Sequence, residues 1–264
     1  MNIIGIDIGG NFTKFALIQN GQIVHRGKTP TKTGCPATLL KNLCTIIDGV
    51  LSATNVPTLD GIGIGVAGMV DTKTGKILSA TNLGITNTDI TAPLSQKYGS
   101  EVKIGNDLAL FALAASKLSG IENLVYIALG TGINAGVVID GKVLAGIEYG
   151  HTTFIPNHPT PCGCGRYGCV EQFINGKILV ENGPTDTLIN HISIMLTNIA
   201  NTYRPSTIYV GGATSTHLKS FEKQLNENIK LSHFGYKNAP PITIKICDLG
   251  NDGGVLGAAF LFTQ

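Results

Sequence analysis

The sequence has no tryptophan and few charged residues. Lys, Arg, Asp and Glu together make up 14% of its 264 residues, and the formal net charge is +2. A net charge this small creates no long-range field that would attract nucleic acid or an acidic membrane surface. We therefore expect neither nucleic acid nor a membrane among the partners of the protein.

Long apolar runs and a recognisable targeting segment are also absent. No uninterrupted apolar run approaches the roughly 20 residues that span a bilayer. The first residues, Met1 to Asp7, contain neither a basic region nor a small-residue cleavage site. Hydrophobic residues nevertheless make up 43% of the chain, which is enough to form one large hydrophobic core or two smaller ones. We expect a soluble, cytoplasmic protein.

Glycine, in contrast, is abundant, with 34 residues that cluster at the ends of apolar runs. The first run, Ile3–Ile8, is broken by Gly9-Gly10 and resumes at Phe12–Ile18. Asn20-Gly21 then separates it from the short run Gln22–Val24. Because Asn-Gly between two apolar runs is typical of a type I′ hairpin, we predict strand, glycine turn, strand, tight hairpin and strand.

The same pattern occurs a second time about 120 residues later. Gly9 and Gly130 are 121 residues apart, and Gly21 and Gly141 are 120 residues apart. This spacing predicts two halves built on one plan. The second copy consists of Val125–Leu129, Gly130-Thr131-Gly132, Ala135–Ile139, Asp140-Gly141 and Lys142–Leu144. Helices are predicted at residues 36–53, 108–118, 186–203 and 255–262 from their apolar spacing.

Three of the six cysteines lie within eight residues and are separated by glycines: Cys162, Cys164 and Cys169. Zinc takes four tetrahedral ligands from thiolates and imidazoles, and His151 is the nearest upstream candidate for the fourth. Disulfide-bonded or unligated cysteines are the alternative, but a Cys-x-Cys pair is poorly placed for a disulfide and three is an odd number. We predict a structural Cys3His zinc site with no position for a catalytic water.

Several acidic residues are candidates for substrate chemistry. Glu148 and Glu171 flank the predicted metal ligands without being needed as ligands, and carboxylates held beside a rigid loop suit the hydroxyl groups of a sugar. Asp107 lies between a predicted strand and a predicted helix, where either Asn106 or Asp107 would be a good helix N-cap. Alternatively, Asp107 is a general base that accepts the proton of an attacking hydroxyl.

The combination E-x-G-H, ten residues, then C-x-C-G-x-x-G-C-x-E resembles the signature of the ROK family of sugar kinases and repressors. The resemblance extends over essentially the whole chain, from Ile4 to Phe262. It implies an α/β protein with the two-domain actin-like (ribonuclease H-like) ATPase fold and an interdomain active-site cleft. Residues 1–118 would form one domain, onto which a C-terminal helix at 253–263 packs, and residues 119–252 would form the other.

The resemblance also implies roles for individual residues, with a structural Zn²⁺ and with Mg²⁺ bound alongside ATP. Asn11 stands where the family usually has Thr, and its amide still offers a hydrogen-bond donor. The implied ATP-binding residues are Asp7, Gly9, Gly10, Asn11, Thr13, Lys14, Gly130, Thr131, Gly132, Gly211 and Gly212. The implied sugar-binding residues are Gly68, Met69, Asn82, Asn106, Asp107, Glu148, His151 and Glu171, with Asp107 as the catalytic base. The implied metal ligands are His151, Cys162, Cys164 and Cys169.

The activity implied by the resemblance is glucokinase-like: ATP-dependent phosphorylation of a hexose or hexosamine at its 6-hydroxyl group by a homodimer. Glucose, N-acetylmannosamine, allose and fructose are all chemically sensible substrates. A repressor would carry a helix-turn-helix segment ahead of the first glycine turn, and the chain begins only a few residues before it. A sugar sensor without catalysis is the third class. The connection between Phe173 and Pro184 is shorter than is usual in the family, which implies that a helical insertion is missing.

Overall fold

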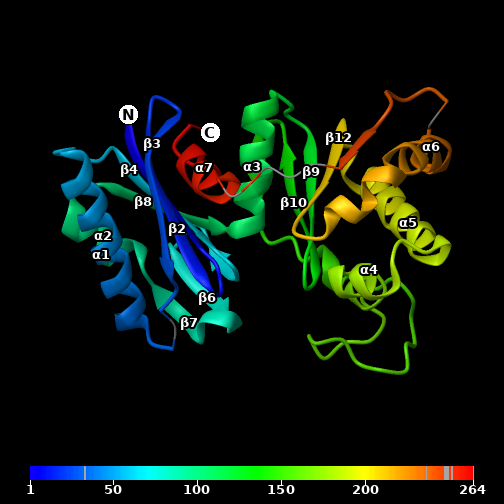
Figure 1. The fold of residues 1–264 in the computed structure, drawn as a ribbon, viewed down its shortest axis with the longest axis horizontal. Helices are drawn as coiled ribbons and strands as arrows, with labels where there is room; N and C mark the ends of the chain where they lie inside the picture. The colour runs from blue at the N-terminus through cyan, green and yellow to red at the C-terminus, as the bar shows by residue number, and fades with distance from the viewer. Residues whose placement is uncertain (33, 236, 247–249, 251, 264) are drawn as a thin grey trace. The chain divides into compact units, whose positions relative to one another are not determined.

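The computed structural model describes residues 1–264 except 33, 236, 247–249, 251 and 264. The chain divides into two compact units, Met1–Ala114 with Asn251–Gln264 and Ala115–Gly250. Each unit contains one five-stranded sheet and its own apolar core. Figure 1 labels β2, β3, β4 and β8 of the first sheet and β9, β10 and β12 of the second.

The main sheet of the first unit has the strand order β3-β2-β1-β4-β8. Its first three strands are antiparallel neighbours, whereas β1, β4 and β8 run parallel to one another. In the register, Ile8 pairs with Val66 and Val66 pairs with Asn106, so the three parallel strands end at one edge of the sheet. The strands are β1 (Asn2–Ile8), β2 (Phe12–Gln19), β3 (Gln22–Pro30), β4 (Gly61–Val66) and β8 (Glu101–Asn106).

Helices pack against this sheet through apolar stripes and glycine contacts. Leu39, Leu43 and Ile47 of α1 belong to its core. A side chain at Gly5 would overlap the carbonyl of Val255, so glycine lets α7 approach β1 closely. The remaining elements of the first unit are α1 (Pro36–Thr54), α2 (Thr91–Tyr98), α7 (Gly253–Phe260), the 3-10 turn η1 (Thr81–Leu83) and the small sheet of β5 (Met69–Asp71), β6 (Lys76–Ala80) and β7 (Ile85–Asp89). Helix α3 (Asp107–Ser119) leads from this unit into the second.

The sheet of the second unit repeats the plan of the first, with the order β11-β10-β9-β12-β13. The predicted duplication is therefore confirmed. Both hairpin turns have positive φ at their two central residues, 50° and 81° at Asn20 and Gly21 and 50° and 73° at Asp140 and Gly141, as a type I′ turn requires. The strands are β9 (Leu124–Leu129), β10 (Ile133–Ile139), β11 (Lys142–Leu144), β12 (Thr207–Gly211) and β13 (Thr243–Ile246).

One long helix, α5, packs into the core of the second unit, where it buries Leu188, Ile192 and Leu196. Its bounds, Asp186–Tyr203, are those predicted from the sequence. The other elements are α4 (Gly176–Asn182), α6 (Glu222–Ser232) and the 3-10 helices η2 (Tyr149–His151), η3 (Val170–Gln172) and η4 (Ser215–Phe221). Within the described ranges, each helix is too short or too polar to cross a bilayer.

Candidate active site and metal centre

The first glycine turn, Gly9 to Asn11, connects β1 to β2. Thr31 supports it from the end of β3, because its hydroxyl donates to the carbonyl of Gly9 (2.8 Å) and its amide donates to the carbonyl of Asn11 (2.9 Å). Gly10 and Asn11 are exposed. A turn held in this way can present its outward amides to an anion such as phosphate.

Thr13, in contrast, has no exposed surface, and its hydroxyl lies 3.0 Å from that of Thr31. The structure thus gives Thr13 a supporting position behind the turn, not a position where its side chain meets a ligand. The reason is the alternation of the strand, which directs Thr13 into the sheet's covered face while its neighbour Lys14 stays partly exposed.

Asp7 lies near the end of β1 and is 8% exposed. Burial raises the pKa of its carboxyl group, and the nearby Lys14, its partner in the register of β1 and β2, acts in the opposite direction. A Cβ atom at Gly254, in the first turn of α7, would lie 2.6 Å from the Asp7 carboxyl group. Gly254 therefore provides the space that this buried acid occupies.

Asn106 and Asp107 stand where β8 ends and α3 begins. The Asn106 Oδ1 accepts hydrogen bonds from the amides of Leu108 (3.0 Å) and Ala109 (3.1 Å), so Asn106 caps the helix. Its Nδ2 donates to the carbonyl of Gly68 at 3.1 Å. Of the two cap candidates in the sequence, the structure assigns the cap to Asn106, and the half-buried Asp107 follows as the first residue of α3.

Gly68, Met69 and Asn82 lie beside the small sheet of the first unit. A Cβ atom at Gly68 would come within 2.5 Å of the carbonyl of Ser79, so the chain passes β6 closely there. Met69 and Asn82 are exposed. The Cβ of Asn82 lies 3.6 Å from where Gly10 would carry one, which places this segment directly beside the first glycine turn. The predicted residues of the first unit thus gather at the carboxyl ends of β1, β4 and β8, the usual ligand edge of a parallel sheet.

The second glycine turn, Gly130 to Gly132, occupies the corresponding place after β9. The amide of Gly130 donates to the carbonyl of Gly132 (3.0 Å), and the carbonyl of Gly130 accepts from the amide of Gly176 (2.7 Å) at the start of α4. Gly211 and Gly212 lie close by, since Gly212, at φ 95°, packs its Cα against the backbone of Leu129. Gly212 therefore packs beside Leu129, the residue before the second glycine turn, and Gly211 pairs with Ala128 in the register of β12 and β9.

Glu171 connects this turn to the cysteine loop. Its Oε2 accepts from the amide of Ile133 at 3.4 Å and occupies the space that a Cβ atom at Gly132 would need. Its Oε1 lies 4.0 Å from the Sγ of Cys162. One carboxylate therefore contacts both the second glycine turn and a predicted metal ligand.

This packing predicts different outcomes for two neighbouring glycines. Gly132→Ala should lower the free energy of unfolding by about 0.5–1 kcal/mol, because the new methyl group displaces the Glu171 carboxylate, the end of a flexible side chain, from its contact with the Ile133 amide. Gly130→Ala is the matched control, since a Cβ atom there would meet nothing within 4 Å. Urea unfolding of both variants measures the difference. Equal stability of the two variants would contradict the placement of Glu171.

Glu148 contacts the residue that follows Ile133 in β10. The exposed Glu148 Oε2 accepts from Nδ2 of Asn134 at 2.9 Å, and Asn134 directly follows Ile133, which contacts Glu171. Both carboxylates are thus attached to the first two residues of β10. Carboxylates with exposed surface are suited to accepting hydrogen bonds from hydroxyl groups of a small molecule.

His151, Cys162, Cys164 and Cys169 converge, with their ligand atoms all within 4.8 Å of one another. The Sγ of Cys162 lies 3.7 Å from Nδ1 of His151, and the Sγ atoms of Cys164 and Cys169 are 3.7 Å apart. A tetrahedral zinc with bonds of about 2.0–2.3 Å separates its ligand atoms by about 3.3–3.8 Å. A disulfide would require about 2.05 Å between sulfurs. The geometry therefore fits the predicted Cys3His metal site.

The two sides of the cluster differ in environment. The amide of Arg166 holds the pKa of the exposed Cys164 below its ordinary value, whereas burial raises the pKa of Cys169 to about 11. Metal binding requires thiolates, and a divalent cation lowers the pKa of a coordinating thiol strongly. Binding of a cation such as zinc would thus convert these cysteine thiols to thiolates, which are soft metal ligands.

Gln172 stabilises the cysteine loop and was not singled out by the sequence. Its Oε1 accepts from the amides of Gly168 (2.7 Å) and Cys169 (3.1 Å), and its Nε2 donates to the carbonyl of Thr160 (2.9 Å). Thr31, Asn134 and Gly254 were missed because each acts through contacts with residues distant in sequence, for which no local pattern exists. Gln172, in contrast, lies three residues after Cys169, which is the spacing of a capping box and a local signal that could have identified it.

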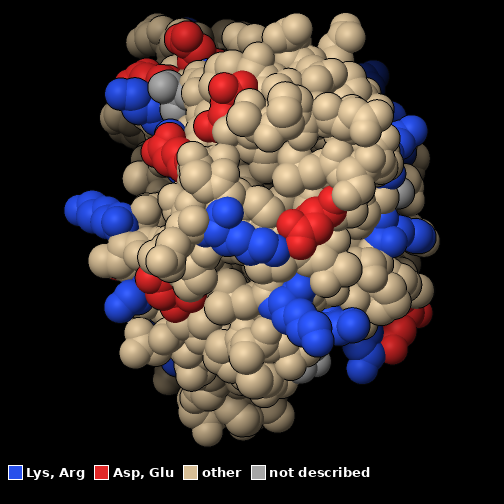
Figure 2. Space-filling model, turned by 90° about the vertical axis from the view of Figure 1, so that its left-hand side faces the viewer, with Lys and Arg blue, Asp and Glu red and all other residues tan. Residues whose placement is uncertain are grey.

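The charged residues on the face of the molecule drawn in Figure 2 include both signs, with Lys and Arg near Asp and Glu and broad uncharged areas between them. This distribution agrees with the low net charge of the sequence. On this face, the described side chains form a mixed surface instead of one of a single sign.

Comparison with known proteins identifies relatives along the whole chain. The model of the ROK family matches residues 3–186 and 180–264. The glucokinase of Halalkalibacterium halodurans is 28% identical over 99% of this chain and 94% of its own length. The xylose repressor of Caldicellulosiruptor bescii is 32% identical over 68% of this chain, which corresponds to 48% of the repressor. Both kinases and repressors are therefore homologues.

A solved structure, the ROK family glucokinase of Streptomyces griseus in complex with glucose and AMPPNP, has a TM-score of 0.75 at 22% identity, with 99% of each chain covered. This likeness confirms the predicted two-domain actin-like fold. The two family matches meet at residues 180–186, and the alignment with the H. halodurans glucokinase spans 318 positions, more than the chain has residues. The relatives thus contain segments that this chain lacks. The connection between Phe173 and Pro184, which adjoins this point, holds the short helix α4.

Proposed function

Because the chain belongs to the ROK family, we propose that it is an ATP-dependent sugar kinase that phosphorylates the 6-hydroxyl group of a hexose or hexosamine. The proposal rests on the different positions of Asn106 and Asp107 at the start of α3. Asn106 supplies the helix cap, and Asp107 begins the helix at the ligand edge of the sheet. A carboxylate that directly follows the capping residue at this edge is placed as a general base requires.

In the proposed reaction, Asp107 accepts the proton of the sugar hydroxyl as its oxygen attacks the γ-phosphorus of ATP. The bond between the γ-phosphorus and the bridging oxygen breaks, and ADP leaves with the electron pair. The two glycine turns, Gly9 to Asn11 and Gly130 to Gly132, would bind phosphate oxygens through backbone amides, with Lys14 adding positive charge. Mg²⁺ bound with ATP would neutralise phosphate charge, and Asp7 is the acid whose raised pKa a nearby cation would lower.

The sugar-binding role falls to Glu148, His151 and Glu171 in the second unit and to Gly68, Met69, Asn82 and Asn106 in the first. His151 presents Nδ1 toward Cys162, so a zinc ion bound there would leave Nε2 as a donor to a hydroxyl group. The zinc would be structural, because three thiolates and one imidazole complete its tetrahedron. We further propose that the protein acts in the cytoplasm as a homodimer.

A non-catalytic sugar-binding regulator is the second candidate function. The 32% sequence identity with a xylose repressor favours it. A kinase and a regulator differ in whether the presence of a sugar leads to release of ADP from ATP. ADP release should be measured with glucose, N-acetylmannosamine, allose and fructose in turn, beside thermal shifts with each sugar alone. We expect sugar-dependent ADP release with at least one of them. A sugar that raises Tm without ADP release from any member of the panel would favour the regulator.

A further inference from the structure

The side chain of Gln172 joins the two ends of the cysteine loop, residues 158–169. At the beginning of the loop, its Nε2 donates to the carbonyl of Thr160 at 2.9 Å. At the end of the loop, its Oε1 accepts from the amides of Gly168 (2.7 Å) and Cys169 (3.1 Å). One amide group thus uses both its nitrogen and its oxygen on the segment that contains the three cysteines of the predicted metal site.

The loop has the form of a short hairpin, and Gln172 closes its open end. Pro161 and Tyr167 pair as an antiparallel bridge. Thr160 and Gly168 are the next pair outward in this register. The carbonyl of Thr160 and the amide of Gly168 meet the nitrogen and the oxygen of the same Gln172 side chain. The two arms of the hairpin are therefore linked through this side chain by hydrogen bonds.

Gln172 also restrains Cys169, which is buried. Its Oε1 accepts from the Cys169 amide, and its own backbone amide donates to the Cys169 side chain in the capping box of η3. The backbone and the sulfur of one predicted metal ligand are thus both held by the same residue. Hydrogen-bond partners of this kind, placed behind a ligand, fix its orientation toward a metal.

We infer that Gln172 is a positioning residue of the metal centre, which holds the cysteine loop in the shape that brings its ligand atoms together. The other two cysteines, Cys162 and Cys164, lie between the loop ends that Gln172 joins. A site that is already shaped binds a cation more tightly, because less of the chain has to be ordered on binding. The inference rests on the structural zinc site proposed above and is independent of the kinase activity.

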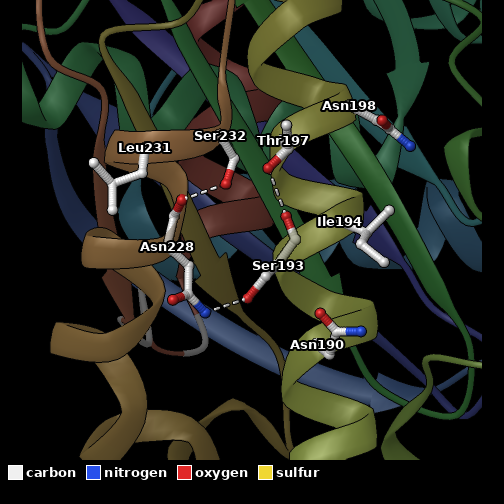
Figure 3. Close-up of a pocket in the computed structure, with 8 residues that line it drawn as sticks. All are labelled: Asn190, Ser193, Ile194, Thr197, Asn198, Asn228, Leu231 and Ser232. Carbon is white, nitrogen blue, oxygen red and sulfur yellow. Dashed lines mark hydrogen bonds between the residues drawn. The ribbon is translucent and has the colours of Figure 1, made fainter.

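Asn228 offers a comparison, because its side-chain amide also bridges two segments of the second unit. Figure 3 shows it at the groove between α6 and α5, where its Nδ2 donates to the hydroxyl of Ser193 at 2.9 Å. The side-chain and backbone hydrogen bonds described for Asn228 stay within these two helices. Asn228→Ala is therefore a matched control, which removes a bridging amide from the same unit without touching the cysteine loop.

The test measures the affinity of the full chain for Zn²⁺ by competition with a chromogenic chelator. Gln172→Ala should raise the dissociation constant for Zn²⁺ by about 10- to 100-fold, the usual effect of removing a hydrogen-bond partner behind a metal ligand. Asn228→Ala should bind Zn²⁺ like the wild type. Gln172→Glu keeps an oxygen for the two amides but lacks the nitrogen that donates to Thr160, so its affinity should lie between those of Gln172→Ala and the wild type.

Melting temperatures with and without Zn²⁺ separate positioning from a general loss of stability. The rise in Tm that Zn²⁺ causes should be smaller in Gln172→Ala than in the wild type, because stabilisation by a ligand follows its affinity. In Asn228→Ala, both Tm values should fall by the same amount. If Gln172→Ala does not fold, Gln172→Glu takes its place, and its dissociation constant should still exceed that of the wild type.

Three results would overturn the inference. Wild-type Zn²⁺ affinity in the Gln172 variant would do so while leaving the metal centre intact. An equal loss of affinity in Asn228→Ala would do so as well, because general destabilisation would then explain both variants. A wild-type chain that binds no Zn²⁺ would overturn the metal centre itself and, with it, the role of Gln172.

Discussion

Asp107→Asn is expected to lower kcat by about 10²- to 10⁴-fold, the usual contribution of a positioned general base. The substitution keeps the size and hydrogen-bonding reach of the side chain but removes the oxygen that takes the proton. Sugar affinity should change little, because Asn still accepts and donates hydrogen bonds. The stability of the protein should also change little, since the cap of α3 is provided by Asn106.

The structure supplies a matched control for this variant. Asp89 accepts hydrogen bonds from the amides of Thr91 and Ala92 at the start of α2, so Asp89→Asn is the same substitution at a helix start without a proposed chemical role. It should retain full turnover. Measuring kcat, sugar Kd and Tm on both variants separates catalysis from capping. An Asp107→Asn enzyme that is stable, binds sugar and turns over normally would exclude Asp107 as the base.

Cys164→Ser is expected to reduce the zinc content from about one ion per chain to nearly none and to lower Tm by about 10 °C. Because Cys164 is exposed, the substitution removes little packing. A large loss of stability therefore has to come from the metal, whose binding free energy is part of the folding free energy. Elemental analysis and thermal unfolding, with protein prepared without chelator, measure both quantities.

The effect should extend to substrates through Glu171, which contacts both Cys162 and the turn at Gly132 and Ile133. We expect KM to rise for the sugar and for ATP. Cys35→Ser is the control, because Cys35 is also an exposed thiol but lies in the first unit, outside the cluster. Wild-type protein without zinc, or a Cys164→Ser variant as stable as Cys35→Ser, would show that the cluster does not hold a structural metal.

Local patterns in the sequence determined the repeated strands, both hairpins and the metal-ligand set. Asn20-Gly21 and Asp140-Gly141 specify their turns because their residues tolerate positive φ, whatever surrounds them. The apolar spacing of residues 186–203 likewise determined α5, since a helix with one apolar side is a property of the segment itself. The cysteines could be assigned to a metal because three ligands lie within eight residues and constrain one another.

Tertiary structure alone decided which of two adjacent polar residues caps α3, that Thr13 is buried behind the first turn, and that Glu171 fills the space beside Gly132. The small sheet of β5, β6 and β7 was missed as well, because its short strands are stabilised by one another and by β8, not by their own sequence pattern. These features depend on contacts between segments far apart in the chain. When the stabilising contacts join distant segments, neither segment has a periodic sequence pattern that would predict them. Such contacts are therefore seen only in the folded structure.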